Sequence, residues 1–231
     1  MTLAIRSLLL GFGQLRDPAV LRVLAKSLVL TVLVFVTLGV GLYFGLVFWF
    51  DEMGLSDSGM AGAATAALLA LISFWFLFRV VALAVLQFFA DEVVQAVERK
   101  HYPDAMHHAR ALPFREDLSN SLKGVGRALL FNLIALPVAL VLLFTAIGPA
   151  VVFLLVNSVL LGRELTDMAW LRHRPEPSAI APVGAGQRLI LGACVAGLML
   201  VPFVNLLAPI IGAAAGTHMV HIRREQLDAN A

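Results

Sequence analysis

The sequence predicts an all-α membrane protein with two long transmembrane helices and two helical hairpins that are broken by proline. Of its 231 residues, 60% are hydrophobic and only 14% are charged, whereas a soluble domain carries roughly a quarter charged residues. The mean hydropathy is +0.90, and the apolar residues form long uninterrupted stretches. The distribution of lysine and arginine also assigns a side of the membrane to almost every connecting segment.

Residues 1–26 are expected to form a helix that lies at the membrane surface. Apolar residues recur at helical spacing from Ile5 to Leu15, with Arg6 and Arg16 among them. An ordinary cytoplasmic segment is an equal alternative. The first transmembrane helix follows at residues 27–50, which carry no charge. At about 1.5 Å per residue, this stretch exceeds a hydrocarbon thickness of roughly 30 Å.

The second transmembrane helix is expected at residues 60–90, continuing as a helix to about residue 100. Arg79 is the only basic residue inside this stretch. A long side chain that reaches back to the interface is the favoured interpretation, and an arginine facing a polar pathway is the alternative. The mixed, charged residues 101–126 then form a cytoplasmic segment.

Two further apolar regions, 127–161 and 188–220, are separated by a cytoplasmic segment at residues 162–187. The first region has breaks at Pro137 and at Gly148-Pro149, and the second at Pro202 and Pro209. In each region an apolar arm follows an arginine, meets a Gly-Pro or Ala-Pro step and continues as a shorter arm. This is a weak internal repeat. Because proline inside a helix costs roughly 3 kcal/mol, we interpret these steps as the turns of hairpins.

Basic residues place both termini and most connecting segments in the cytoplasm. The loop at residues 51–59 is the exception, because it has no lysine or arginine and carries three acidic residues. The two long helices therefore lead out and back, and each broken region must enter and leave on the same side. Short second arms, at residues 150–161 and 210–216, favour re-entrant (hemi-penetrating) hairpins. Four full crossings with kinked helices are the alternative.

Three strings resemble the CysZ and etoposide-induced protein family. They are LLLGFGQLRDPAVLRVLAKSL near the N-terminus, FFADEVVQAVERKHYP after the second span and NSVLLGRELTDMAWLRHR after the first hairpin. The resemblance covers nearly the whole chain. It implies two long transmembrane helices with two pairs of hemi-penetrating helices. For members similar to CysZ, it implies a sulfate permease of the bacterial inner membrane.

The resemblance also implies an oxyanion site at the start of the first long helix. A helix N-terminus offers free N–H groups there, and arginine adds a forked donor. Pro18 and Arg22 match the family's segment, whereas Ala19 replaces a glycine and Leu21 replaces an arginine. Weak sulfate binding, binding of another anion and no sulfate transport all stay open.

Arg163, Glu164 and Asn205 are the other candidate substrate-binding residues. Arg163 could guard a cytoplasmic anion vestibule with Glu164 orienting it, and the equal alternative is a structural role, with the arginine at the interface and Glu164 capping the helix that follows. Asn205 could offer its amide to a passing anion, or it could bond carbonyl groups that Pro209 leaves free.

We expect no cofactor, no metal and no enzyme activity. His218 and His221 could share a helical face, but no cysteine or acidic residue stands at ligand spacing from them. The sequence also lacks a phosphate-binding loop, a nucleophile elbow and a zinc-protease helix. Intrinsic ATP-driven transport is therefore not expected.

The favoured function is an anion permease that passes sulfate or a related oxyanion toward assimilation. We expect it to work as a homo-oligomer in the lipid bilayer of the bacterial inner membrane, without nucleic acid. The alternative is a non-transporting scaffold or bilayer-shaping protein, because hemi-penetrating hairpins wedge one leaflet.

Overall fold

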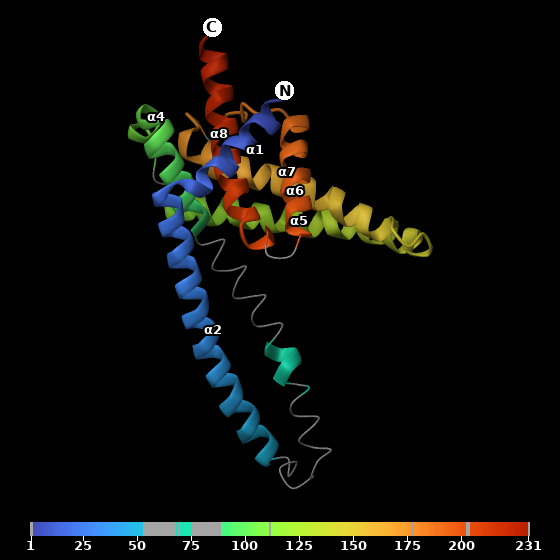
Figure 1. Ribbon diagram of the computed structural model, residues 1–231. Coiled ribbons are helices and arrows are strands. Elements are labelled where there is room, and N and C mark those ends of the chain that lie inside the picture. Colours follow the sequence, from blue (N-terminus) through green and yellow to red (C-terminus); the bar gives the residue numbers. More distant parts are fainter. Residues whose placement is uncertain are drawn as a thin grey trace. The chain divides into compact units, whose positions relative to one another are not determined.

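The computed structural model describes residues 2–52, 68, 70–74, 89–110, 112–176, 178–201 and 204–230. Every regular element in these residues is a helix (Figure 1), which confirms the predicted all-α class. The α-helices are α1 (Leu3–Gly13), α2 (Pro18–Glu52), α4 (Pro103–His107), α5 (Phe114–Val141), α6 (Gly148–His173), α7 (Ala185–Met199) and α8 (Ala208–Asp228). The 3-10 helices are η1 (Gln14–Arg16), η3 (Leu142–Phe144) and η4 (Val204–Leu206). Residues 70–74 and 89–101 are also helical. Most of the acidic loop, Arg79 and Pro202 lie outside the described residues.

Three helical stretches are long and apolar enough to cross a membrane. They are Pro18–Trp49, Phe114–Phe144 and Gly148–His173. Their large apolar side chains are widely exposed, as at Leu133 and Val141 of α5, which are 68% and 74% exposed. Water would penalise such surfaces, whereas lipid tails do not. The chain is therefore a membrane protein. The number of spans and the side on which the termini lie stay predictions.

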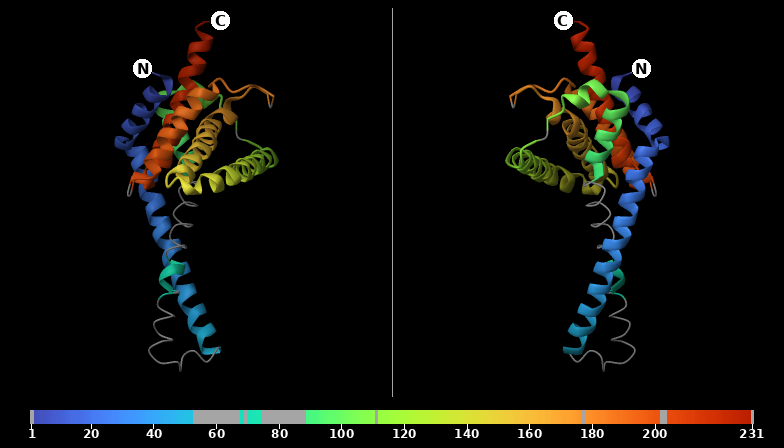
Figure 2. Two further views of the ribbon diagram at one scale, coloured as in Figure 1. Left: turned by 90° about the vertical axis from the view of Figure 1, so that its right-hand side faces the viewer. Right: turned by 90° about the vertical axis from the view of Figure 1, so that its left-hand side faces the viewer.

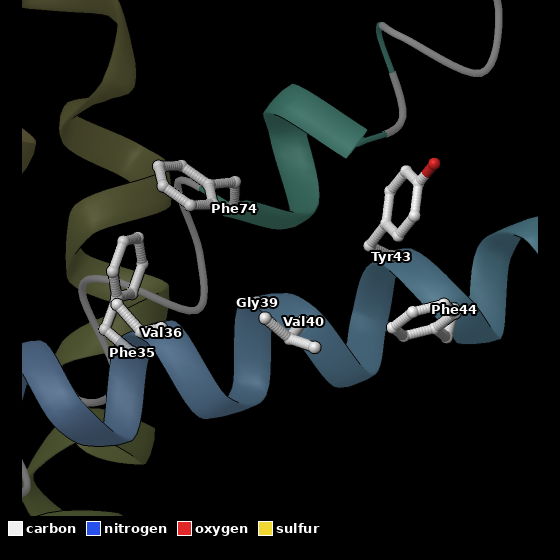
Figure 3. Close-up of a pocket in the computed structure, with 7 residues that line it drawn as sticks. All are labelled: Phe35, Val36, Gly39, Val40, Tyr43, Phe44 and Phe74. Carbon is white, nitrogen blue, oxygen red and sulfur yellow. The ribbon is translucent and has the colours of Figure 1, made fainter.

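The chain divides into two compact units, one of residues 22–89 and one of residues 1–21 and 90–231. The smaller unit is built on α2, with helical residues 70–74 beside it. Phe35 and Phe74 meet edge to face there, with ring centroids 4.3 Å apart. An open groove of about 390 Å³ adjoins this contact (Figure 3), lined by Phe35, Val36, Gly39, Val40, Tyr43, Phe44 and Phe74. Its lining carries no charge, so it offers an oxyanion nothing to pair with.

The larger unit contains two helical hairpins, and proline begins the second arm of each. The first hairpin joins α5 to α6, with Pro149 in the first turn of α6. The second joins α7 to α8, with Pro209 in the first turn of α8. Proline is tolerated in this position because the N–H that it lacks would have no partner within the helix. The Gly-Pro and Ala-Pro steps thus mark the turns, as predicted.

Two other expectations about the hairpins are wrong. Pro137 does not break the first arm, because it lies inside a continuous α5. The second arms are not short either, since α6 has 26 residues and α8 has 21. Both helices continue after their apolar stretch ends, and most of α8 from Ile210 to Ile222 is buried in protein. The lengths of α6 and α8 therefore do not support hairpins that reach only partway across the membrane.

Glycine lets α6 and α7 cross at very short range. A Cβ atom added to Gly162 of α6 would clash with the carbonyl oxygen of Arg188 on α7. A Cβ atom added to Gly192 of α7 would clash with the carbonyl oxygen of Ser158 on α6. The two backbones thus approach to a distance that only glycine permits. This crossing fixes the position of residues 158–167 against the start of α7.

Glycine also allows close contacts between α8 and its neighbours. A Cβ atom on Gly216 would clash with the carbonyl oxygen of Leu165 on α6, and one on Gly11 of α1 would lie 2.7 Å from the carbonyl oxygen of Ile211. Figures 1 and 2 show α1, α7 and α8 gathered together, with α6 running across α7 and α8. Close packing is what the small-residue pattern from Gly212 to Gly216 predicts. The result is a core in which side chains of α6, α8 and residues 90–101 meet.

Candidate functional site

A network of polar side chains runs through the larger unit, and most of them are buried, whereas Lys100 and His101 are exposed. Ionisable groups are rarely buried unless they are paired. The network draws on η1 and Asp17, on residues 98–102, on the end of α6 and on α8. Its members are Gln14, Asp17, Glu98, Lys100, His101, Tyr102, Arg172, His173, His218 and His221.

Glu98 is the centre of one half of the network and is fully buried. Its Oε1 accepts hydrogen bonds from His173 Nε2 at 2.7 Å and from His221 Nε2 at 3.1 Å. Its Oε2 lies 3.7 Å from the Arg172 guanidinium and has no hydrogen-bond partner among the described residues. Burial acts to raise the pKa of Glu98, but these hydrogen bonds, with the charges of His173 and Arg172, lower it to about 2. Glu98 is thus an ionised carboxylate that faces two imidazoles.

Tyr102 links His221, which bonds to Glu98, to a second pair of histidines, His218 and His101. Its ring stacks on His221 with centroids 4.4 Å apart, and its hydroxyl lies 2.8 Å from His218 Nδ1. Gln14 Nε2 lies 3.1 Å from His218 Nε2 and 2.9 Å from His101 Nε2. Because an amide nitrogen only donates, both imidazoles accept there, and His218 donates from Nδ1 to the tyrosine. Burial, followed by the charges of His101 and His221, lowers the pKa of His218 to about 4, in agreement with this neutral tautomer.

The start of α2 is capped by the chain's own carboxylate. Asp17 Oδ1 accepts the Ala19 backbone N–H at 2.7 Å, and its Oδ2 lies 2.5 Å from Lys100 Nζ. Pro18, the first residue of α2, is exposed and has no N–H to donate. Arg22 is also exposed and belongs to the smaller unit. The helix end where the resemblance implies an oxyanion therefore already holds a carboxylate and its counter-ion.

Arg163 forms an ion pair on its own helix. Arg163 Nε lies 3.3 Å from Asp167 Oδ2, one helical turn along α6. Arg188, near the start of α7, is close enough for the charges of both Asp167 and Arg163 to act on it. Arg188 Nε donates to the Val183 backbone carbonyl at 2.9 Å, so two guanidinium groups with different partners lie near each other at the glycine crossing. Glu164 is exposed on the same helix as Arg163.

Asn205 is not brought together with Arg163. It lies exposed in η4, after the end of α7, whereas Arg163 lies near the beginning of α7. Roughly 15 Å of α7 separates these two places, at about 1.5 Å per residue. Within the larger unit, Asn205 therefore does not share a site with Arg163.

Sequence reasoning missed the carboxylate that accompanies the histidines. Glu98 is 75 positions from His173 and 123 positions from His221, so no local spacing relates them. A signal was present in the sequence, because Glu98 follows the buried Val94 by four residues and so shares its helical face. Arg188 likewise comes near Arg163 only through the crossing of α6 and α7, whereas Asp167 stands four residues after Arg163 on α6, a spacing that the sequence shows. Three ligand atoms, one each from Glu98, His173 and His221, lie within 4.8 Å of one another and could hold a metal ion.

The apolar helices and the polar network place this chain among the α-helical integral membrane proteins. Within that class, the family model described as Sulfate transporter CysZ/Etoposide-induced protein 2.4 matches residues 7–209, and the chain belongs to this family. The match confirms the family resemblance, and the family is a transporter type. No curated protein and no solved structure matches the chain.

Proposed function

We propose that the protein is an anion permease that carries sulfate across the bacterial inner membrane to supply its assimilation. The observation that carries this proposal is the family match, because the family's description names a sulfate transporter and the match covers residues 7–209. The three apolar helical stretches supply the membrane setting that a permease needs. We retain the homo-oligomer as part of the proposal.

We place the main anion contact at Arg163 and Arg188. Arg163 pairs with Asp167 and its side chain is 51% exposed, and Arg188 brings a second guanidinium group near it. Guanidinium groups donate paired N–H bonds to oxyanions, and two of them can face one sulfate. Pro18, Arg22, Glu164 and Asn205 stay in the proposal as further contacts along the route.

Equilibrium binding of radiolabelled sulfate to the purified full-length protein tests this site. Loss of a charge-assisted hydrogen-bond pair costs roughly 1.5–3 kcal/mol, so Arg163→Ala and Arg188→Ala should each weaken binding by about tenfold or more. Arg99→Ala is the matched control, because Arg99 is an exposed arginine on another helix. Wild-type affinity in both cluster variants would remove the site from the proposal. Absence of sulfate binding to the wild type would remove sulfate as the substrate.

A non-transporting scaffold or bilayer-shaping protein is the second candidate. It is favoured by the start of α2, where Asp17 occupies the helix end and Ala19 and Leu21 depart from the family's anion segment. A scaffold needs no anion route, so these features would not impair its function. Sulfate uptake by correctly inserted protein separates the two candidates.

A further inference from the structure

We propose that Glu98, His173 and His221 form a binding site for a divalent metal ion, with Zn²⁺ as the ion that they fit best. One carboxylate oxygen and two imidazole nitrogens lie within 4.8 Å of one another. Two histidines and one glutamate are an established set of three zinc ligands, with water as the fourth. The inference is independent of sulfate transport.

The three ligands are held by the fold before any ion arrives. Their side chains are 0%, 2% and 3% exposed for Glu98, His173 and His221. They come from three separate segments, which are helical residues 90–101, the end of α6 and α8. Ordering such a constellation in the native state lowers the entropic cost of binding, because the ligands need not be gathered.

The distances are close to those of a tetrahedral site. His173 Nε2 and His221 Nε2 lie 2.7 Å and 3.1 Å from Glu98 Oε1. With metal–ligand bonds of about 2.0–2.2 Å, neighbouring ligand atoms lie roughly 3.3 Å apart. The two Nε2–Oε1 pairs therefore need to separate by only a few tenths of an ångström, and all three ligand atoms lie within 4.8 Å of one another. To bind the ion through Nε2, a neutral imidazole moves its proton from Nε2 to Nδ1 through solvent and a protonated one releases its Nε2 proton, so that both ligate in the neutral form.

Glu98 offers a second reason to expect an ion. Its Oε2 is buried without a hydrogen-bond partner among the described residues. A buried carboxylate oxygen left in this way is costly, and a cation between Glu98 and the imidazoles would add a positive charge beside this carboxylate. Arg172, at 3.7 Å from Oε2 and 17% exposed, provides part of the counter-charge in the metal-free state. The ring of Tyr102 stacks on His221 and holds that imidazole in its orientation.

The bound ion would tie together three segments that the chain brings to one place. It would link the helix that follows the second predicted span to α6 and α8. An ion that binds only the folded state stabilises it by an amount that grows with the logarithm of the ion concentration above the Kd. Zinc should therefore raise the thermal stability of the protein, and its removal should lower it.

The test uses full-length protein in detergent, with any purification tag removed and bound metal stripped by EDTA. We expect elemental analysis after addition of ZnCl₂ and desalting to find one zinc per chain. At zinc concentrations about 100 times the Kd, we expect the Tm to rise by about 5 °C or more. Glu98→Gln and His221→Gln should each lower the affinity for zinc at least tenfold. His107→Gln, which alters an exposed histidine, should bind zinc as the wild type does.

Three results would overturn the site. The first is wild-type protein that retains no zinc and shows no shift in Tm. The second is equal zinc retention by Glu98→Gln and His221→Gln. The third uses no variant, and so stands even if the variants misfold: wild-type protein loaded with Co²⁺ should show the visible d–d absorption of a tetrahedral site, and it should lose this absorption when Zn²⁺ is added. A spectrum identical to that of hydrated Co²⁺ contradicts the proposal.

Discussion

His218 shows what burial does to a single ionisable residue in this protein. Its imidazole is 1% exposed and bonds to Tyr102 and Gln14, while His101 and His221 also face it. Burial is the largest cause of the neutral ring, the charges of His101 and His221 act in the same direction, and Gln14 donates where a proton would have to sit. The hydrogen bonds that orient the ring also fix its protonation state.

This neutral state makes stability depend on pH. The pKa of His218 is about 4 in the folded protein and 6.5 as its ordinary value, so between these values the unfolded chain binds a proton that the folded chain does not. The free energy of unfolding should therefore fall as the pH drops from about 6.5 to about 4, by about 3 kcal/mol at most. Thermal unfolding of EDTA-treated protein across this range measures the effect.

The matched variant for this prediction is His218→Gln. Glutamine can still bond to Tyr102 and Gln14, but it does not titrate, so the decline in Tm between pH 6.5 and 4 should become shallower. An unchanged pH profile in His218→Gln would assign the decline to other groups.

At the scale of elements, glycine contacts hold the helices in their crossing positions. We expect Gly162→Ala to destabilise the protein by about 3 kcal/mol or more, because the added methyl meets the rigid carbonyl oxygen of Arg188. Gly124→Ala is the control, since Gly124 of α5 has nothing within 4 Å of the added methyl. Alanine there should be neutral or stabilise by about 0.5–1 kcal/mol. Thermal unfolding of both variants in detergent measures the difference, and equal Tm values would contradict the close crossing.

The sequence predicts where several of the helices begin, but it does not predict how far they continue. The uncharged stretch after Lys26 predicted the apolar part of α2, and the steps at Pro149 and Pro209 predicted where second arms begin. Hydropathy failed for the rest of α8, because residues such as His218 are buried by neighbouring helices and not by lipid. It also failed at Pro137, since a long helix can absorb one missing hydrogen bond.

At the scale of the whole molecule, the sites depend on contacts that sequence spacing does not reveal. Arg163 and its carboxylate partner Asp167, four residues later on the same helix, could be chosen from the sequence, but the approach of Arg188 follows from the way α6 meets α7. Glu98 joins His173 and His221 only after three segments have packed. Local periodicity can mark a buried position, but it cannot say which distant side chain shares it.

The central claim is that this member of the family moves sulfate. The most direct test is uptake of radiolabelled sulfate into liposomes that contain the purified full-length protein, compared with empty liposomes and with the variants Arg163→Ala, Arg22→Ala and Arg99→Ala. We predict saturable uptake that falls about tenfold or more in Arg163→Ala and is unchanged in Arg99→Ala. An equal fall in Arg22→Ala would add the start of α2 to the route. No uptake above empty liposomes by correctly inserted wild-type protein would contradict the account and favour the scaffold.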